Sequence, residues 1–181
     1  MDIESSLREL GQVDSEALIE TVLAQDEEAW AINQYRQNAC AVHSHTESLV
    51  MIFCDGWPEM KVTKEASWDA LKETAVPLMR HIINEFYPQG GTVIRAMAAK
   101  LKAGGVISPH RDTHQSFCHS HRIHVPITTN PGVRFMINGR PHRLQVGNAY
   151  EINNQRNHSV MNSGNEDRIT FIFDYLPPKT A

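Results

Sequence analysis

The sequence predicts a mainly β fold, a jelly-roll or cupin-like barrel that lies behind an N-terminal helical layer. Eight segments within residues 92–177 have the length and composition of short strands and are separated by turn residues. Asn138-Gly139 lies between two of these segments and is a strong signal for a two-residue hairpin. Residues 1–91 show mostly helical periodicity instead. Many short strands behind a helical layer favour a barrel or a two-sheet architecture.

The first half is expected to form a helical layer with one strand. Asp14 is placed to cap a helix whose apolar stripe lies within residues 18–23. Ser67 precedes a longer helical pattern, in which apolar residues recur at spacings of three and four over residues 71–86. Between these helices, residues 48–55 (SLVMIFCD) form an apolar run that is consistent with a buried strand.

The second half is expected to form the core of the barrel. Its candidate strands are residues 92–101, 106–110, 122–128, 133–138, 142–146, 148–153, 158–162 and 168–176. No break in composition separates one part of the chain from another. We therefore expect a single domain over residues 1–181, with residues 1–91 as the helical layer and residues 92–177 as the barrel core.

The composition excludes several classes of protein. The chain has 181 residues and a formal net charge of −4, with 41% hydrophobic and 21% charged residues. This balance is ordinary for a globular domain and lacks the basic footprint of a nucleic-acid-binding protein. The longest apolar run, residues 49–54, is too short to span a bilayer, and the acidic N-terminus does not resemble a secretory signal. We expect a cytoplasmic protein whose partner is a small molecule or a peptide, with no nucleic acid and no membrane.

Histidine is concentrated in one stretch. Residues 108–124 (SPHRDTHQSFCHSHRIH) hold five of the ten histidines. His110 and Asp112 are two residues apart, so their side chains project to the same side if they lie at the end of a strand. A third ligand must then come from elsewhere in the fold, and His158, which opens a late strand, is the best placed. Two histidines and one carboxylate form the facial triad that leaves three positions open on Fe(II).

Two other interpretations of these histidines remain open. A His-x-Asp pair occurs by chance in many proteins, where it is a half-exposed histidine beside a solvated aspartate. A competing metal site could use Cys118, His119, His121 and His124. However, the three cysteines of the chain are widely spaced and no second cysteine lies near Cys118, which disfavours a closed zinc site.

Arginines accompany these histidines on the predicted strands. Arg168 begins the strand RITFIFDYL and shares a face with Thr170, Ile172 and Asp174. At that position the arginine either caps a surface edge or points into the barrel, where its planar fork suits a carboxylate. Arg122 and His124 share a face of another strand, and they would form a second cationic cluster near the metal if that face is interior.

The pattern as a whole resembles a known family. PHRD, RIH after nine intervening residues, NH in NHSV and the arginine of DRITFIFD are similar to the aspartyl/asparaginyl β-hydroxylase family of Fe(II)- and 2-oxoglutarate-dependent oxygenases. The segments VHSHTESLVMIF and LKAGGVISPHRD also resemble that family, including its bacterial free-proline hydroxylases. The resemblance extends from about Ala41 to Pro177, which is most of the chain.

The resemblance implies a double-stranded β-helix with a specific set of site residues. It assigns the iron to His110, Asp112 and His158. It places the distal carboxylate of 2-oxoglutarate on Arg168, with Arg122 and His124 supporting the co-substrate from the other side. The implied cofactors are therefore Fe(II), 2-oxoglutarate and O2.

The expected function is hydroxylation of an unactivated C–H bond in an amino acid, an amino-acid-derived metabolite or a peptide side chain. Two alternatives stay open: a metal-dependent cupin enzyme with non-oxidative chemistry, and a ligand-binding module without turnover. For the substrate, the alternating residues Arg134, Met136 and Asn138 are candidates at the mouth of the pocket.

Overall fold

The computed structural model describes residues 1–32 and 45–178; the rest of the predicted domain, residues 33–44 and 179–181, lies outside the described part. The helical elements are α1 (Glu16–Leu23), α2 (Glu27–Ala31), α4 (Trp68–Phe86) and the 3-10 turn η2 (Gln115–Cys118). The strands are β1 (Leu7–Gln12), β2 (Thr46–Asp55), β3 (Lys61–Lys64), β4 (Thr92–Leu101), β5 (Val106–His110), β6 (His121–Thr128), β7 (Val133–Ile137), β8 (Arg140–His142), β9 (Asn148–Ile152), β10 (His158–Asn162) and β11 (Arg168–Leu176). No helix of the described residues is long and apolar enough to cross a membrane.

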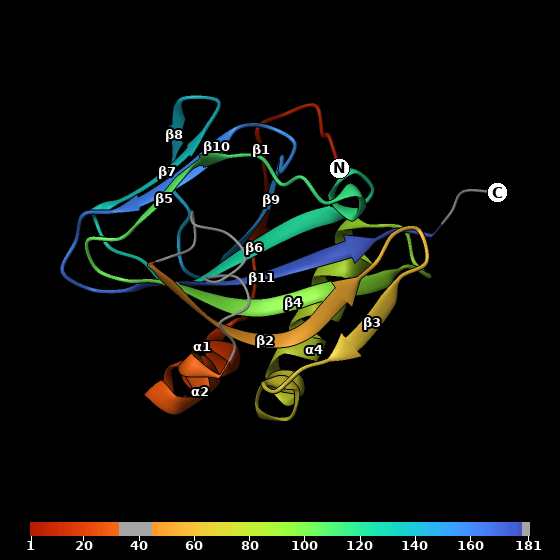
Figure 1. Ribbon diagram of the computed structural model, residues 1–181, viewed down its shortest axis with the longest axis horizontal. Coiled ribbons are helices and arrows are strands. Elements are labelled where there is room, and N and C mark those ends of the chain that lie inside the picture. Colours follow the sequence, from red (N-terminus) through yellow and green to blue (C-terminus); the bar gives the residue numbers. More distant parts are fainter. Residues whose placement is uncertain (33–44, 179–181) are drawn as a thin grey trace.

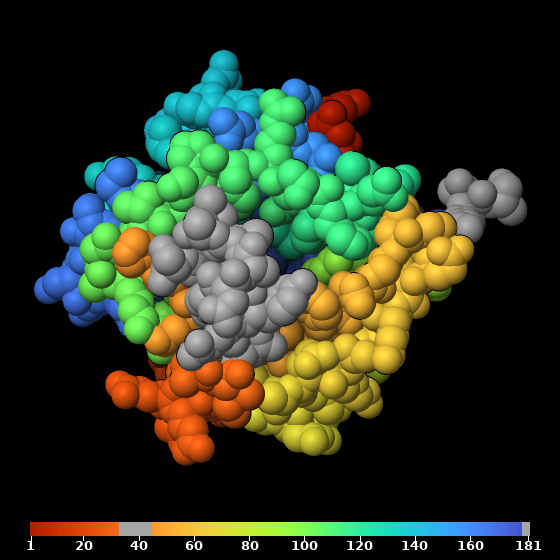
Figure 2. All heavy atoms as spheres, in the orientation of Figure 1, coloured from red at the N-terminus to blue at the C-terminus, as the bar shows by residue number. Residues whose placement is uncertain are grey.

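The strands form two antiparallel sheets that face each other across the interior of a barrel (Figure 1). The larger sheet has the order β1-β9-β6-β11-β4-β2-β3, and the smaller one has the order β5-β10-β7-β8. Helices α1, α2 and α4 cover the outer face of the larger sheet, and they form the lower edge of the molecule in the space-filling view (Figure 2). This arrangement confirms the predicted mainly β barrel with an N-terminal helical layer.

Strand β11 shows how the sequence builds the two faces of the larger sheet. It lies between β6 and β4, and its residues point alternately to the helices and to the barrel interior. Ile169, Phe171 and Phe173 pack in the core beneath the helices, where burying each phenylalanine contributes roughly 1.5–3 kcal/mol. Arg168 and Ile172 line a pocket on the opposite face, inside the barrel. The apolar alternate residues therefore fix which polar residues face the interior.

The first half of the chain contains more β structure than predicted. The helical layer was expected to include one strand, but β1 and β3 accompany β2 in the larger sheet. Strand β1 (LRELGQ) fully buries only Leu10 and half-buries Leu7, because it pairs with β9 at the edge of the sheet and most of its other side chains face solvent. An edge strand with so few apolar residues lacks the alternation that identifies a strand in a sequence.

Two local predictions were also wrong. Helix α1 has Ser15 rather than Asp14 as its N-cap residue. The predicted strand over residues 142–146 begins earlier and is shorter, because the two-residue turn at Asn138-Gly139 pairs Ile137 directly with Arg140 and β8 ends at His142. Both turn residues have positive φ, 50° and 74°, as the predicted hairpin requires.

Candidate metal centre

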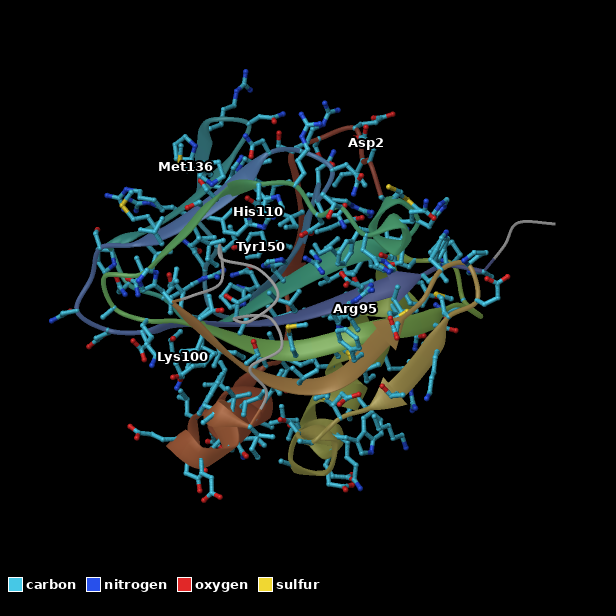
Figure 3. All side chains as sticks on the ribbon, viewed as in Figure 1. Asp2, Arg95, Lys100, His110, Met136 and Tyr150 are labelled. Atoms are coloured by element: carbon cyan, nitrogen blue, oxygen red, sulfur yellow. The ribbon has the colours of Figure 1, made fainter. Side chains whose placement is uncertain are left out.

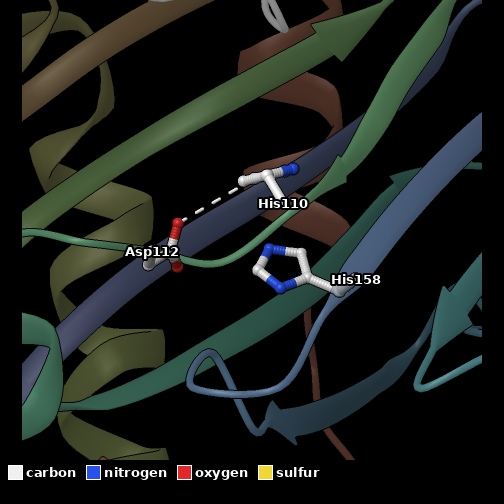
Figure 4. Close-up of side chains that lie close together, drawn as sticks. All are labelled: His110, Asp112 and His158. Carbon is white, nitrogen blue, oxygen red and sulfur yellow. Dashed lines mark ion pairs between the residues drawn. The ribbon is translucent and has the colours of Figure 1, made fainter.

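His110, Asp112 and His158 converge at one end of the barrel interior (Figure 4). One ligand atom from each lies within 4.8 Å of the others. His110 is the last residue of β5 and His158 is the first of β10, and the antiparallel register places these two residues opposite each other. Asp112 follows two residues after β5, on the loop that leaves the small sheet. The three residues that the sequence predicted as ligands therefore come together although 48 positions separate His110 from His158.

Backbone carbonyl groups orient both imidazole rings. His110 Nδ1 lies 2.8 Å from the carbonyl oxygen of Ser108, and His158 Nδ1 lies 3.0 Å from that of Arg156. Because a carbonyl oxygen only accepts hydrogen bonds, each Nδ1 must carry the proton and donate. Each Nε2 then holds the lone pair that a metal ion requires, an arrangement typical of metal-binding histidines.

The protonation state of His158 also suits a metal ligand. Burial lowers the pKa of His158 below its ordinary value, against a smaller opposing contribution from Asp112. The neutral imidazole is therefore favoured at pH 7, and it is the neutral form that binds metal ions.

Asp112 is held by two contacts that fix its carboxylate. Arg122 Nη1 donates to Asp112 Oδ2 at 2.6 Å, and the backbone N–H of Asp112 donates to the carbonyl oxygen of Asn154 at 3.3 Å. The other carboxylate oxygen, Oδ1, lies 4.0 Å from His110 Nε2. Oδ2 of Asp112 therefore faces Arg122, and Oδ1 lies on the side of the histidines. This orientation suits a carboxylate that binds a metal through one oxygen.

Arg122 bridges Asp112 to a second buried carboxylate, that of Asp174. Its Nε and Nη2 atoms donate to Asp174 Oδ1 and Oδ2 at 2.8 and 2.9 Å, and its guanidinium lies 4.4 Å from the centre of the Phe117 ring. Burial would lower the pKa of Arg122, but the charges of Asp112 and Asp174 outweigh it and raise the pKa. The sequence placed Asp174 on the same strand face as Arg168, left open whether that face is interior, and gave Asp174 no role. The sequence signal that could have identified Asp174 is that it shares a strand face with Arg168, a predicted co-substrate residue.

The other predicted co-substrate residues lie farther along the same interior. One pocket is lined by His110, Asp112, His158, Arg122, His124 and Arg168 together with apolar side chains. His124 is buried, and its ring centre lies 5.8 Å from that of Phe135. The structure therefore brings all six predicted metal and co-substrate residues into one pocket.

Arg168 is buried in very different surroundings from Arg122. Only 5% of the residue is exposed, and no carboxylate of the described residues pairs with its guanidinium. Its aromatic neighbour is Phe135, whose ring centre lies 5.8 Å away. Burial alone lowers the pKa of Arg168 to about 10, so the side chain is charged at pH 7. Thr170, the next residue on the same face, has a buried hydroxyl that no group in the described part of the chain bonds.

The candidate substrate residues do not face this pocket, which corrects the sequence interpretation. On β7 the inward residues are Phe135 and Ile137, which belong to the core. Arg134 and Met136 alternate with them and point outward, and Figure 3 shows Met136 at the outer surface, away from His110. Asn138 is an exposed residue of the hairpin turn. The interpretation failed because VRFMI has apolar residues in both alternating sets, so the pattern alone does not tell which set is interior.

The competing cluster around Cys118 is not a metal site in the described structure. His119 stacks on Trp57 with the ring centres 4.8 Å apart. His121 bonds Glu151 at 2.5 Å on the opposite face of the larger sheet from His124. Among the described residues, the one grouping able to hold a metal ion is His110, Asp112 and His158.

The donor set fits a divalent iron ion. Two imidazole nitrogens and one carboxylate oxygen form the ligand set used by non-haem Fe(II) oxygenases. Three protein ligands leave open positions for a chelating co-substrate and for O2. A positively charged guanidinium in the same pocket, with no carboxylate partner in the described part of the chain, is suited to a ligand that carries a carboxylate.

Comparison with known proteins agrees with this geometry. The family model described as aspartyl/asparaginyl beta-hydroxylase matches residues 12–178. No curated protein sequence matches the chain significantly.

Solved structures with a similar fold are remote in sequence. An oxidoreductase of the 2OG-Fe(II) oxygenase family from Burkholderia pseudomallei is 10% identical, with a TM-score of 0.58 over 100% of this chain and 95% of that one. HygX from Streptomyces hygroscopicus, solved with nickel, 2-oxoglutarate and hygromycin B, is 11% identical, with a TM-score of 0.58 over 98% and 85% of the two chains. A collagen prolyl hydroxylase of Paramecium bursaria chlorella virus-1, in complex with 2OG, is 10% identical, with a TM-score of 0.55 over 97% and 98%. At these identities the likeness shows the fold.

Proposed function

We propose that this chain, which belongs to the aspartyl/asparaginyl β-hydroxylase family, is an Fe(II)- and 2-oxoglutarate-dependent dioxygenase. Its substrate would be an amino acid, an amino-acid-derived metabolite or a peptide side chain, hydroxylated at an unactivated C–H bond. The observation that carries the proposal is one pocket lined both by His110, Asp112 and His158 and by a buried Arg168 that no carboxylate of the described residues pairs.

The metal would be held by Nε2 of His110, Nε2 of His158 and Oδ1 of Asp112. The bound iron would supply the reactivity toward O2 and the C–H bond. The protein's contribution is orientation: the carbonyl groups of Ser108 and Arg156 fix the two imidazole rings, and Arg122 holds the remaining oxygen of Asp112. Such supporting hydrogen bonds typically change metal affinity or activity 10- to 100-fold when they are removed, as a rough guide.

The co-substrate would lie along the pocket between the metal and Arg168. 2-Oxoglutarate has a keto-acid end that chelates a metal and a distal carboxylate that needs a cation. Arg168 offers a planar pair of donors and has no competing carboxylate among the described residues. The unbonded hydroxyl of Thr170 lies on the same face and could donate a further hydrogen bond. A buried cation and a buried hydroxyl without partners are the groups that a bound carboxylate would satisfy.

The overall reaction would consume the substrate, 2-oxoglutarate and O2, and it would release the hydroxylated substrate, succinate and CO2. One oxygen atom of O2 enters succinate and the other enters the new hydroxyl group. The apolar lining of Ile107, Phe135 and Ile172 would exclude water from the reacting centre.

The test is a screen for substrate-stimulated succinate release. Free amino acids and short peptides are supplied with Fe(II), 2-oxoglutarate and O2, and succinate and the hydroxylated product are measured together. The proposal expects equal amounts of both products from at least one substrate. Turnover of a substrate without any need for 2-oxoglutarate would indicate non-oxidative metal chemistry, and metal and ligand binding without any turnover would indicate a binding module.

A further inference from the structure

A second pocket lies behind Arg168, at the other end of the barrel interior. We call it the far pocket. Its polar lining includes His142, Arg143, Gln145 and Arg168, and the other lining residues are Phe135, Leu144, Pro126, Thr129, Asn130, Pro131 and Val133. Phe135 and Arg168 line both pockets, so these two side chains form the partition between them. The metal residues do not line the far pocket. The far pocket is therefore separate from the proposed metal and co-substrate site but shares one buried cation with it.

The register of the small sheet directs His142 into this space. His142 pairs with Phe135, and directly opposed residues of an antiparallel pair point to the same face. Since Phe135 is a buried interior residue, His142 also points inward. Its Nε2 atom is buried, and nothing in the described part of the chain bonds it.

The charge of the far pocket has one sign. Arg168 and Arg143 are cationic, His142 and Gln145 can donate hydrogen bonds, and none of the lining residues is acidic. Only 5% of Arg168 is exposed, and no carboxylate within residues 1–32 and 45–178 pairs with it. A buried guanidinium without an ion pair and a buried imidazole nitrogen without a hydrogen bond, as both are among the described residues, are costly unless a ligand satisfies them.

We propose that the far pocket binds a small oxyanion, and that this anion and 2-oxoglutarate compete electrostatically for Arg168. The anion would accept hydrogen bonds from Arg143 and His142 while it neutralises Arg168 from behind. The distal carboxylate of 2-oxoglutarate would approach the same guanidinium from the metal side. With one cation between two anions, each anion weakens the other, because their mutual repulsion in the interior is poorly screened. The antagonism rests on the proposed function, whereas the anion site itself does not.

The anion site is tested first, with inorganic phosphate and metal-free protein. Calorimetric titration should show one binding site in the wild-type protein and an affinity about tenfold weaker in Arg143→Gln, the loss expected for one charge-assisted hydrogen bond. Arg140→Gln is the matched control, since Arg140 is an exposed arginine of the same hairpin that does not line the pocket. Arg140→Gln should bind phosphate as the wild type does.

Three results would overturn the anion site. The first is no phosphate binding by the wild-type protein. The second is equal affinity in Arg143→Gln and the wild type, which would indicate an adventitious ion elsewhere. The third is an equal loss in Arg140→Gln, which would indicate general surface charge. His142→Leu provides an independent check, because it removes the buried nitrogen without changing the charge of the surface, and it should also weaken phosphate binding.

The antagonism is tested by measuring 2-oxoglutarate affinity with and without saturating phosphate, in protein loaded with a divalent metal. We expect the dissociation constant of 2-oxoglutarate to rise about fivefold or more in the wild type and to change little in Arg143→Gln. Unchanged affinity in the wild type would overturn the antagonism. Absence of any 2-oxoglutarate binding would overturn the proposed function instead, while the phosphate titrations would still decide the anion site.

Discussion

The two ends of the barrel interior each bury an arginine, and the surroundings of the two arginines are opposite. Arg122 donates to Asp112 and Asp174 through three of its nitrogen atoms, and these carboxylates raise its pKa. Arg168 has no carboxylate partner among the described residues, and burial lowers its pKa to about 10. The first arginine already has its anions within the fold. The second has a buried charge that a ligand must satisfy.

This contrast assigns different tasks to side chains of the same type. Removal of an arginine whose charge is paired within the fold should damage the fold, because its carboxylates are left buried without compensation. Removal of an arginine whose charge is unpaired should weaken ligand binding and raise the free energy of unfolding. The sequence interpretation gave both arginines to the co-substrate, whereas the contacts favour Arg122 as the residue that holds Asp112. The predictions below test that division.

The largest effect is expected at the metal end. Asp112→Ala removes the anionic member of the proposed ligand set and one of the two carboxylates of Arg122, so succinate release should fall at least about a hundredfold and metal affinity should fall with it. Asp69→Ala is a matched control, because Asp69 is an exposed residue of α4 whose ion pair among the described residues is with Lys72. Full activity in Asp112→Ala would show that Asp112 is not a ligand.

The stability of the metal-free protein should separate the two arginines directly. Arg122→Met should lower the free energy of unfolding by about 3–5 kcal/mol, because it removes both hydrogen bonds of Arg122 to the fully buried Asp174 and leaves only the longer ion pair with Arg95, at 3.9 Å. Arg168→Met should instead raise it by about 1–2 kcal/mol, because it replaces an unpaired buried charge with an apolar side chain. Chemical denaturation of both variants beside the wild type measures the difference. Equal destabilisation by the two substitutions would remove the contrast.

Co-substrate binding should respond to the shape of the group at position 168. Arg168→Lys keeps the charge but loses the planar fork, so the Michaelis constant for 2-oxoglutarate should rise by one to two decades, if the fork contributes roughly 1.5–3 kcal/mol. Arg168→Ala should raise it further, and metal affinity should stay nearly unchanged in both. An unaltered 2-oxoglutarate dependence in Arg168→Ala would leave the metal site intact and eliminate the co-substrate assignment.

The smallest effect is expected on the outer face of the small sheet. Arg134→Ala and Met136→Ala alter side chains that point away from the pocket, so the kinetic constants should match the wild type and stability should change by less than about 0.5 kcal/mol. Steady-state kinetics with the substrate found in the screen provides the check. A change in substrate affinity in either variant would restore these residues as candidates and contradict the interior face assigned to β7.

The convergence of the candidate metal residues could be predicted from the sequence because each histidine lies at the end of a recognisable strand. His110 and Asp112 are two residues apart at the end of a strand, and His158 opens a strand that pairs with it. The alternation of RITFIFDYL likewise indicated that Arg168 shares a face with Thr170 and Ile172, and that face is interior. The barrel could be predicted from its strand-and-turn pattern, since β4, β5, β10 and β11 have the predicted bounds.

The remainder depended on pairings that a sequence pattern does not specify. The sequence left open whether the faces that carry Arg122 and Asp174 are interior, and it did not indicate that the two residues bond each other, because that contact requires the register of β6 against β11. The interior face of β7 was misassigned for the same reason: only the pairing with β10 decides between Phe135 and Met136. Strand β1 was missed because an edge strand exposes most of its side chains.

The central claim is that one pocket holds a metal at His110, Asp112 and His158 and a carboxylate at Arg168. The most direct measurement is a crystal structure of the protein with 2-oxoglutarate and nickel(II), used as a substitute for iron. The account predicts the metal on Nε2 of both histidines and Oδ1 of Asp112, with the keto acid chelating it and the distal carboxylate paired with Arg168. A metal bound elsewhere, or a distal carboxylate turned away from Arg168, would contradict it.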